Sequence, residues 1–258
     1  MFVESGDALL YGTCYGPKDA PAIVGIGGWI GSGELWALPF EGLSQRWRTL
    51  SYDHRGSGAS VAPVASITLA NLVGDVFAML DAYGIERCVL AAESSGALTA
   101  LSAARLHPER VTGLVIVDGM VYRGLDPAAD PFSDPFLKGL QHAYPATLDR
   151  FVDLCMPEGG ASHIKRWGRQ IINRAAPEAA IALRQVNSAA DIRAELPHIQ
   201  QPTLIIHCDG DKIVPIEQAR SLAQTLPLAE LVVFKDSGHI PTMTRPLEIA
   251  AHIERFFA

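Results

Sequence analysis

A serine stands at the point where a buried strand gives way directly to a helix. Residues 91–96 read Ala-Ala-Glu-Ser-Ser-Gly and lie between an apolar, strand-like run and a helix-like run. A turn this tight exposes the serine at the edge of the sheet, and it requires small residues two positions before and after it. Ala92 and Gly96 meet this requirement around Ser94, whereas Ser95 would be flanked by a glutamate. We therefore predict that Ser94 is a nucleophile.

A serine hydroxyl is a weak nucleophile at neutral pH, so it needs a general base, and that base needs an acid to orient it. When the chain order is Ser, Asp, His, both partners belong to loops that follow later strands. The strand that ends at residue 207 is followed by Cys-Asp-Gly-Asp-Lys-Ile-Val-Pro, which places Asp211 in such a loop. The strand that ends at residue 234 is followed by Lys-Asp-Ser-Gly-His-Ile-Pro, which places His239 in the next one.

These loops must be held by a sheet, and apolar strands do alternate with helical patterns in the first half of the chain and in its last quarter. Near-continuous apolar strands separated by helices are typical of a parallel sheet covered on both faces. The pattern predicts strands at 22–26, 48–53, 87–92, 111–117, 202–207 and 230–234, and helices at 69–83, 96–106, 216–226 and 246–257. The predicted fold class is α/β, with a mostly parallel sheet flanked by helices.

The alternation stops between about residues 120 and 197, where the sequence indicates helices only. A proline- and aspartate-rich loop over 126–135 is followed by helical stretches near 136–143, 146–155, 162–175 and 177–190. An all-helical block between two strands of one sheet predicts a lid over the carboxyl edge, where ligands of open α/β sheets bind. We expect a core of residues 1–119 and 198–258 and a helical cap of residues 120–197.

With these motifs in order, the chain resembles an α/β-hydrolase over essentially its whole length. The resemblance rests on the segment Gly27–Trp29, the loop Asp53–Gly58, the elbow at Ser94, and the loops that carry Asp211 and His239. Each motif is weak alone, but their order and spacing match the family. We expect the Asp53–Gly58 loop to be structural, with its arginine and aspartate tying neighbouring loops together.

The resemblance also implies an oxyanion hole. In this family one backbone N–H comes from the residue after the nucleophile, and the other comes from a loop after an early strand that usually reads His-Gly-X. By position these donors are Ser95 and Trp29, with Gly27 standing where the family has its histidine. Gly28 in the same loop and Trp167 in the lid are the candidate substrate-binding residues.

The mechanism implied by the family has two steps. His239 takes the proton of Ser94 while Asp211 orients the imidazole, Ser94 attacks a carbonyl, and water then hydrolyses the acyl-enzyme. Asp118 is the alternative acid, because it ends the strand 111–117 and some members of the family place the acid there. Asp211 is favoured since its Gly-Asp-Lys-Ile-Val-Pro run matches the usual loop. Strand alternation indicates that Glu93 points away from the nucleophile.

Composition narrows the class of protein. The 258 residues carry a formal net charge of −7 and no basic run, which argues against a nucleic-acid partner. We see no signal peptide and no apolar stretch near the ~20 residues of a membrane span. The four cysteines show no close pairing, which indicates free thiols in the cytoplasm. No metal-ligand spacing or phosphate-binding glycine loop occurs, so we expect neither metal nor cofactor.

We therefore predict a cytoplasmic monomer or homodimer that hydrolyses a small carboxylic ester or lactone. The serine argues against the epoxide hydrolases and haloalkane dehalogenases of this fold, which use an aspartate nucleophile. Three alternatives stay open: hydrolysis of a carbon–carbon bond in a vinylogous diketone, a perhydrolase or lyase activity, and a ligand receptor that retains the triad. The first half most resembles enol-lactonase-like and small esterase members, which is an analogy at the level of fold.

Overall fold

The centre of the molecule is an eight-stranded sheet with the order β1-β2-β4-β3-β5-β6-β7-β8. The computed structural model describes residues 1–123 and 134–258. Most of the predicted proline- and aspartate-rich loop lies in residues 124–133, outside the described residues. The strands are β1 (Phe2–Ser5), β2 (Ala8–Tyr15), β3 (Ala22–Ile26), β4 (Arg48–Tyr52), β5 (Cys88–Glu93), β6 (Val111–Val117), β7 (Thr203–Cys208) and β8 (Ala229–Phe234).

Strands β3 to β8 pair in parallel, so the carboxyl ends of β5, β6, β7 and β8 meet at one edge. This confirms the predicted α/β class. The structure adds an antiparallel hairpin, β1 and β2, at the edge next to β4. This hairpin was not predicted, because β2 alternates buried and exposed residues at the border of the sheet instead of forming an apolar run.

Helices cover both faces of the sheet. The helices of the core are α1 (Ala37–Leu43), α2 (Leu69–Ala82), α3 (Gly96–Leu106), α8 (Ile216–Thr225), α9 (Pro241–Thr244) and α10 (Pro246–Phe256). Alternate residues of β5 enter two separate cores: Leu90 packs with α2, α3 and α8, and Val89 packs with α1 and α10. Burial on both faces explains why the inner strands are apolar throughout.

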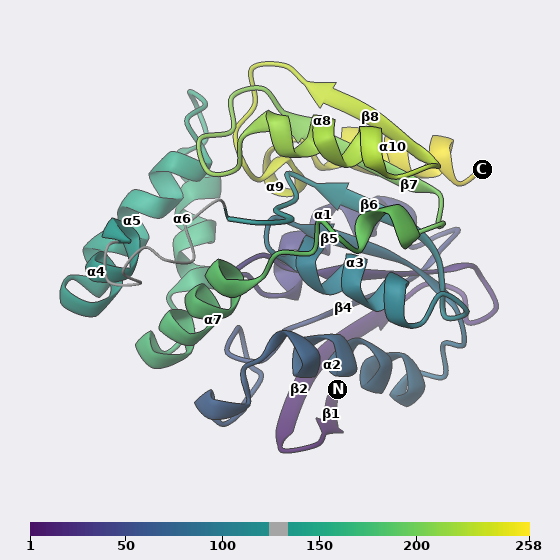
Figure 1. Ribbon diagram of the computed structural model, residues 1–258, viewed down its shortest axis with the longest axis horizontal. Helices are drawn as coiled ribbons and strands as arrows, with labels where there is room; N and C mark the ends of the chain where they lie inside the picture. The colour runs from purple at the N-terminus through teal and green to yellow at the C-terminus, as the bar shows by residue number, and fades with distance from the viewer. Residues whose placement is uncertain (124–133) are drawn as a thin grey trace.

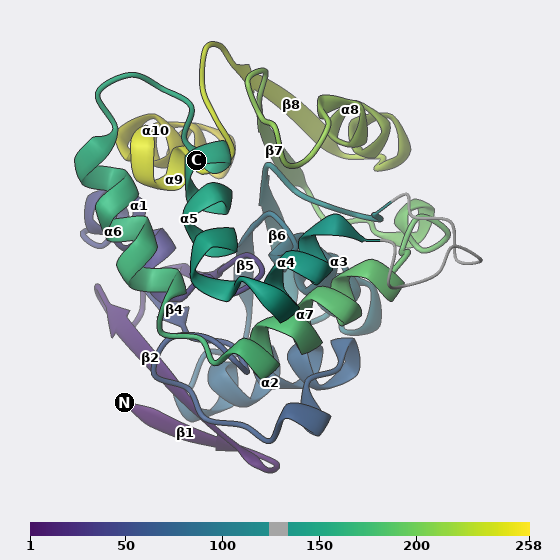
Figure 2. The ribbon, with the colours of Figure 1, turned by 90° about the vertical axis from the view of Figure 1, so that its left-hand side faces the viewer.

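Between β6 and β7 the described chain forms four α-helices, which we call the lid. They are α4 (Pro135–His142), α5 (Tyr144–Cys155), α6 (Ser162–Ile172) and α7 (Pro177–Ala189). Proline opens α4, α5 and α7, where its missing N–H leaves no helical hydrogen bond unmade. The lid helices gather on one side of the molecule (Figure 1), and the view from that side shows them in front of the sheet (Figure 2).

Two further findings concern membrane spans and the cysteines. Within the described ranges, no helix combines the length and the apolar character that crossing a membrane requires. All four cysteines are free thiols; Cys88, Cys155 and Cys208 are buried, and Cys14 is partly exposed.

Candidate active site

The turn between β5 and α3 holds Ser94 in an unusual backbone conformation. Its φ is +53°, in the left-handed region that residues other than glycine rarely adopt. Such a conformation costs about 1–3 kcal/mol, so the surrounding packing must enforce it. The packing leaves no room for larger residues, because a Cβ on Gly96 would lie 2.6 Å from the carbonyl oxygen of Gly27. The small residue expected at position 96 is therefore needed because the loop that carries Gly27 lies against it.

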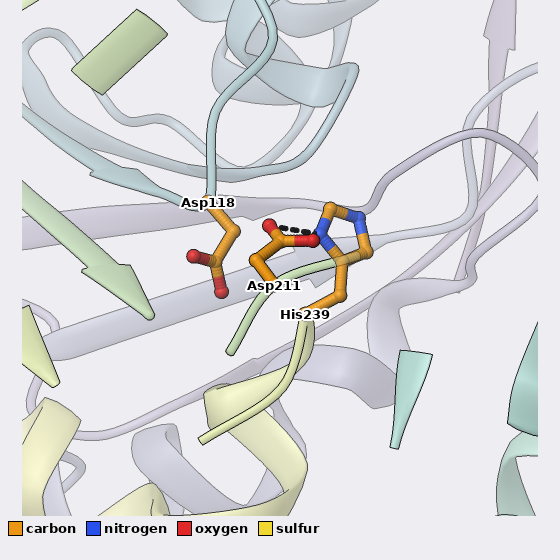
Figure 3. Close-up of side chains that lie close together, drawn as sticks. All are labelled: Asp118, Asp211 and His239. Atoms are coloured by element: carbon orange, nitrogen blue, oxygen red, sulfur yellow. Dashed lines mark hydrogen bonds and ion pairs between the residues drawn. The ribbon is translucent and has the colours of Figure 1, made fainter. Parts of the chain in front are cut away.

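The three side chains singled out in the sequence lie in one hydrogen-bonded series. Nε2 of His239 is 2.8 Å from Oγ of Ser94, and Nδ1 is 2.7 Å from Oδ2 of Asp211. The second of these bonds is drawn in Figure 3. The carboxylate can only accept, so Nδ1 carries the proton, and the lone pair of Nε2 faces the serine hydroxyl. An imidazole in this tautomer can take the serine proton.

Asp211 is held as an anion even though it is buried. Burial by itself raises the pKa of this carboxyl, but His239 and the backbone N–H groups of Ile213 and Val214 outweigh burial and lower it. The two N–H groups donate to Oδ1 over 2.7 and 3.0 Å, which leaves Oδ2 for the imidazole. A charged carboxylate at this place stabilises the imidazolium that forms when the serine loses its proton.

The glycine-rich loop after β3 lies directly against the serine. A Cβ on Gly28 would lie 2.9 Å from Cβ of Ser94, so only glycine allows this approach. Among the residues the structure describes, the backbone N–H groups of Trp29 and Ser95 donate no hydrogen bond to protein atoms. Free donors beside a nucleophile are what an oxyanion hole requires.

His54, which the sequence analysis treated as structural, supports this loop. Its Nε2 lies 3.0 Å from the carbonyl oxygen of Gly28, and its Nδ1 lies 3.0 Å from that of Arg55. The ring is buried, and it contacts the loop at the position next to Trp29. The loop that has Gly27 in place of a histidine is thus contacted by a histidine from the segment after β4. Only the fold could reveal this contact, because the two residues are 26 positions apart.

A small apolar cavity of about 50 Å³ adjoins the serine. Its walls come from the glycine-rich loop, the lid helices α5 and α6, and the segment after β8. Its lining residues include Gly28, Trp29, Leu35, Ser94, Phe151, Val152, Met156, Ile172, His239 and Met243. Trp167 is not among them, because its indole N–H donates to Glu34 over 3.1 Å. The cavity therefore offers a reacting group apolar contacts on one side and the serine hydroxyl on the other.

Comparison with known proteins identifies the family. The sequence pattern of the alpha/beta hydrolase family matches residues 23–252. The chain belongs to this family. It is a hydrolase by family.

The relatives of the hydrolase cover almost its whole length. A putative carbamate hydrolase, RutD, from Caulobacter vibrioides is 30% identical over 95% of this chain and 94% of its own. A pimeloyl-[acyl-carrier protein] methyl ester esterase from Nitrosomonas europaea is 31% identical over 88% of this chain and 92% of its own. The solved enol-lactonase from Burkholderia xenovorans LB400 is 25% identical with a TM-score of 0.91, covering 100% of this chain and 99% of its own.

The lid of the hydrolase contacts the loop that carries His239. The backbone N–H of His239 donates to the carbonyl oxygen of Cys155 over 2.8 Å. Oε1 of Glu158 accepts from the N–H of Gly238 and from the hydroxyl of Ser237. A Cβ on Gly238 would lie 2.4 Å from that same carbonyl of Cys155, so glycine is needed for the approach. The sequence carried no signal of these contacts, which join residues about 80 positions apart.

The Asp53–Gly58 loop of the hydrolase ties neighbouring segments together, as expected. Asp53 accepts from the backbone N–H groups of Gly33 and Ala59 over 2.8 and 2.7 Å. Arg55 is buried and forms a two-bond pair with Asp75 over 2.7 and 2.9 Å. The side chains of Asp53 and Arg55 are hydrogen-bonded to neighbouring loops and to α2, so they are not available for chemistry at the serine.

Proposed function

We propose that the protein hydrolyses a small carboxylic ester or lactone through an acyl-enzyme on Ser94. One observation carries the proposal: the series Ser94–His239–Asp211, with bonds of 2.8 and 2.7 Å, ends in a serine hydroxyl beside a small apolar cavity. The esterase and lactonase named among its relatives act on substrates of this class. The proposal also assigns the lid helices as the cap over this site.

Each step of the proposed reaction uses a group already placed at the site. Nε2 of His239 takes the proton of the Ser94 hydroxyl as Oγ bonds to the carbonyl carbon, and the N–H groups of Trp29 and Ser95 stabilise the oxyanion. The carbon–oxygen bond to the alcohol then breaks, and the imidazolium returns its proton to the leaving oxygen. Water repeats the sequence on the acyl-enzyme and frees the acid and Ser94. Asp211 stays ionised throughout and stabilises the imidazolium.

The cavity limits the group that can sit beside the serine. A volume of about 50 Å³ accommodates about three to five groups the size of water, since about 10–15 Å³ of such volume holds one water. We therefore propose an acyl group of about two or three carbon atoms, because a longer chain must displace lid side chains at a cost of about 1–3 kcal/mol.

A small carbamate is the second candidate substrate. The carbamate hydrolases that resemble this chain over 95% of its length favour it. A carbamate carbonyl reacts with the same serine and the same oxyanion hole, so the difference lies in the leaving group and in the rate of deacylation.

The experiment is steady-state hydrolysis of p-nitrophenyl acetate, propionate, hexanoate and octanoate, of simple lactones and of a p-nitrophenyl carbamate. We expect Ser94→Ala to lose at least about 10³-fold in kcat and to lose labelling by a fluorophosphonate. Ser162→Ala, on the exposed start of α6, is the matched control and should behave as wild type.

The chain-length profile tests the cavity. Acetate and propionate should be hydrolysed about tenfold faster or more, in kcat/KM, than octanoate. Equal rates for octanoate would contradict the assignment of this cavity as the acyl site. Hydrolysis that survives Ser94→Ala would refute the acyl-enzyme, and a wild type that is labelled but turns over none of the panel would refute the substrate class.

A further inference from the structure

The site contains a second carboxyl group that the proposed reaction does not use. Asp118 directly follows β6 and Asp211 follows the neighbouring strand β7, so both belong to the same edge of the sheet. One oxygen of each and a ring nitrogen of His239 all lie within 4.8 Å of one another. Figure 3 shows the two carboxyl groups side by side, with the bond to the imidazole coming from Asp211.

Asp118 is fully buried, and only one of its two carboxyl oxygens has a hydrogen-bond partner among the described residues. Its Oδ1 accepts from the backbone N–H of Cys208 over 2.8 Å, and its Oδ2 has no partner among the described residues. Its φ of +45° lies in the left-handed region, so the chain adopts a strained conformation to bring this side chain to the site. The titratable groups around it among the described residues are Glu93, Cys155, His207, Cys208, Asp211 and His239.

The neighbouring His207 supplies no positive charge that would favour ionisation of Asp118. Nε2 of His207 lies 3.1 Å from the carbonyl oxygen of Val214, which can only accept, so the proton of a neutral ring is on that nitrogen. Burial lowers the pKa of His207 and keeps the ring neutral. Nδ1 of His207 lies 3.6 Å from Oδ1 of Asp118, beyond hydrogen-bond distance, so the neutral ring gives this carboxyl neither a hydrogen bond nor a charge.

Two carboxyl groups that share a buried site disfavour each other's ionisation, so the pKa of one of them is raised. Burial and the charge of Asp211 raise the pKa of Asp118 well above its usual range, while Asp211 carries the charge. Loss of the negative charge at position 211 removes one of the causes that raise the pKa of Asp118. A shift of about 2 Å would then bring an oxygen now within 4.8 Å to hydrogen-bond distance of the imidazole.

We propose that Asp118 is a positioning residue held in reserve, which orients His239 when the carboxylate at position 211 is lost. This inference rests on the proposed function, since it concerns the orientation of the same base. It predicts that the site tolerates loss of its acid better than a triad with a single carboxyl, in which that loss costs about 10⁴-fold in kcat.

The test compares Asp211→Ala, which leaves room for Asp118 to turn, with the double variant Asp211→Ala/Asp118→Asn. We expect about a 10²-fold loss of kcat in the single variant and about 10⁴-fold in the double variant, with KM changing little. Asp118→Asn should cost at least tenfold more in the Asp211→Ala background than alone. The matched control is Asp211→Ala/Asp209→Asn. Asp209 lies in the same loop and is exposed, and its side chain bonds only the N–H of Asp236 among the described residues. This control should have the same kcat as Asp211→Ala.

The pH profile gives a readout that a structural role would not move. In Asp211→Ala, kcat should fall at acid pH as Asp118 becomes protonated. This part of the pH dependence should be absent from the double variant. A single variant that already loses about 10⁴-fold overturns the proposal even if the double variant does not fold. An equal cost of Asp118→Asn in both backgrounds also overturns it. Ser94→Ala is measured in parallel: if it keeps wild-type turnover, the proposed function and this inference fall together, whereas an inactive Ser94→Ala isolates the failure to Asp118.

Discussion

Glu93 is a buried carboxyl immediately before the proposed nucleophile. Its side chain has no exposed surface, and Oε1 accepts from the hydroxyl of Thr242 over 2.9 Å. Burial raises the pKa of Glu93 to about 8; the bond to Thr242 opposes this rise and the charge of Asp211 adds to it. Glu93 is therefore a neutral acid at pH 7 in the folded protein, although the same residue is ionised in the unfolded chain.

This difference makes stability depend on pH. Between the usual pKa of 4.5 and the folded value of about 8, the unfolded state has lost the proton that the folded state keeps. The free energy of unfolding therefore falls as pH rises through this window, by up to about 1.4 kcal/mol per pH unit. Glu93→Gln keeps an acceptor for Thr242 and cannot ionise, so its stability relative to wild type should rise steadily from pH 5 to pH 8.

Urea unfolding at several pH values measures this effect. Glu41→Gln, which changes an exposed carboxylate on α1, is the control and should show a constant difference from wild type. A difference between Glu93→Gln and wild type that stays constant from pH 5 to pH 8 would show that Glu93 is ionised in the folded protein.

At the scale of elements, the lid lines the cavity and contacts the loop that carries His239, the proposed base. The end of α5 and the turn after it receive three hydrogen bonds from the His239 loop, one at the carbonyl of Cys155 and two at Glu158. The imidazole must lie within hydrogen-bond distance of both Ser94 and Asp211, so a small displacement of its loop disturbs both bonds. Lid position and base orientation are therefore coupled in this structure.

Glu158 tests this coupling. Glu158→Ala should lower kcat about tenfold and change KM less, because it frees the N–H of Gly238 and loosens the loop before the base. Glu158→Gln keeps an oxygen acceptor and should recover most of the loss. Glu178→Ala, on the exposed first turn of α7, is the control in the same lid. A wild-type kcat in Glu158→Ala would show that the Cys155 contact alone holds the loop.

Helices and strands also show which parts of the structure could be predicted from the sequence. The inner strands and the four lid helices were predicted to within a few residues, because their apolar patterns report burial on two faces or on one. Ser94, Asp211 and His239 could be assigned to one site because each follows a parallel strand, and such strands end at one edge. His54 and Glu158 could not be found this way, since each acts through contacts to backbone atoms of another loop, for which the local sequence gives no signal.

At the scale of the whole molecule, Arg55 joins three parts of the chain that are distant in sequence. It forms a two-bond pair with Asp75 of α2, and its other N–H groups donate to Asp7 over 2.6 Å and to the carbonyl of Ser5 over 2.9 Å. The hydrogen bond to Asp75 is the main cause that raises the pKa of Arg55. This side chain anchors the β1–β2 hairpin, which the sequence analysis did not predict, to the helical layer and to the loop after β4.

Replacing Arg55 by methionine should therefore destabilise the entire fold. The side chain of Asp75 has no exposed surface, and without Arg55 it becomes a buried charge without a cation, so we expect a loss of about 3–5 kcal/mol in the free energy of unfolding. The double variant Arg55→Met/Asp75→Leu removes both charges and should recover a large part of this loss. Arg46→Met is the matched control, since the side chain of Arg46 is 70% exposed and its pair with Glu254 at the surface contributes about 1 kcal/mol or less. The free energy of unfolding of all four proteins is measured by urea unfolding. Its slope against urea concentration should be the same in each. A loss below about 1 kcal/mol in Arg55→Met would mean that Asp75 finds solvent or a proton when its partner is removed, and that the hairpin is held by its strand pairing to β4 alone.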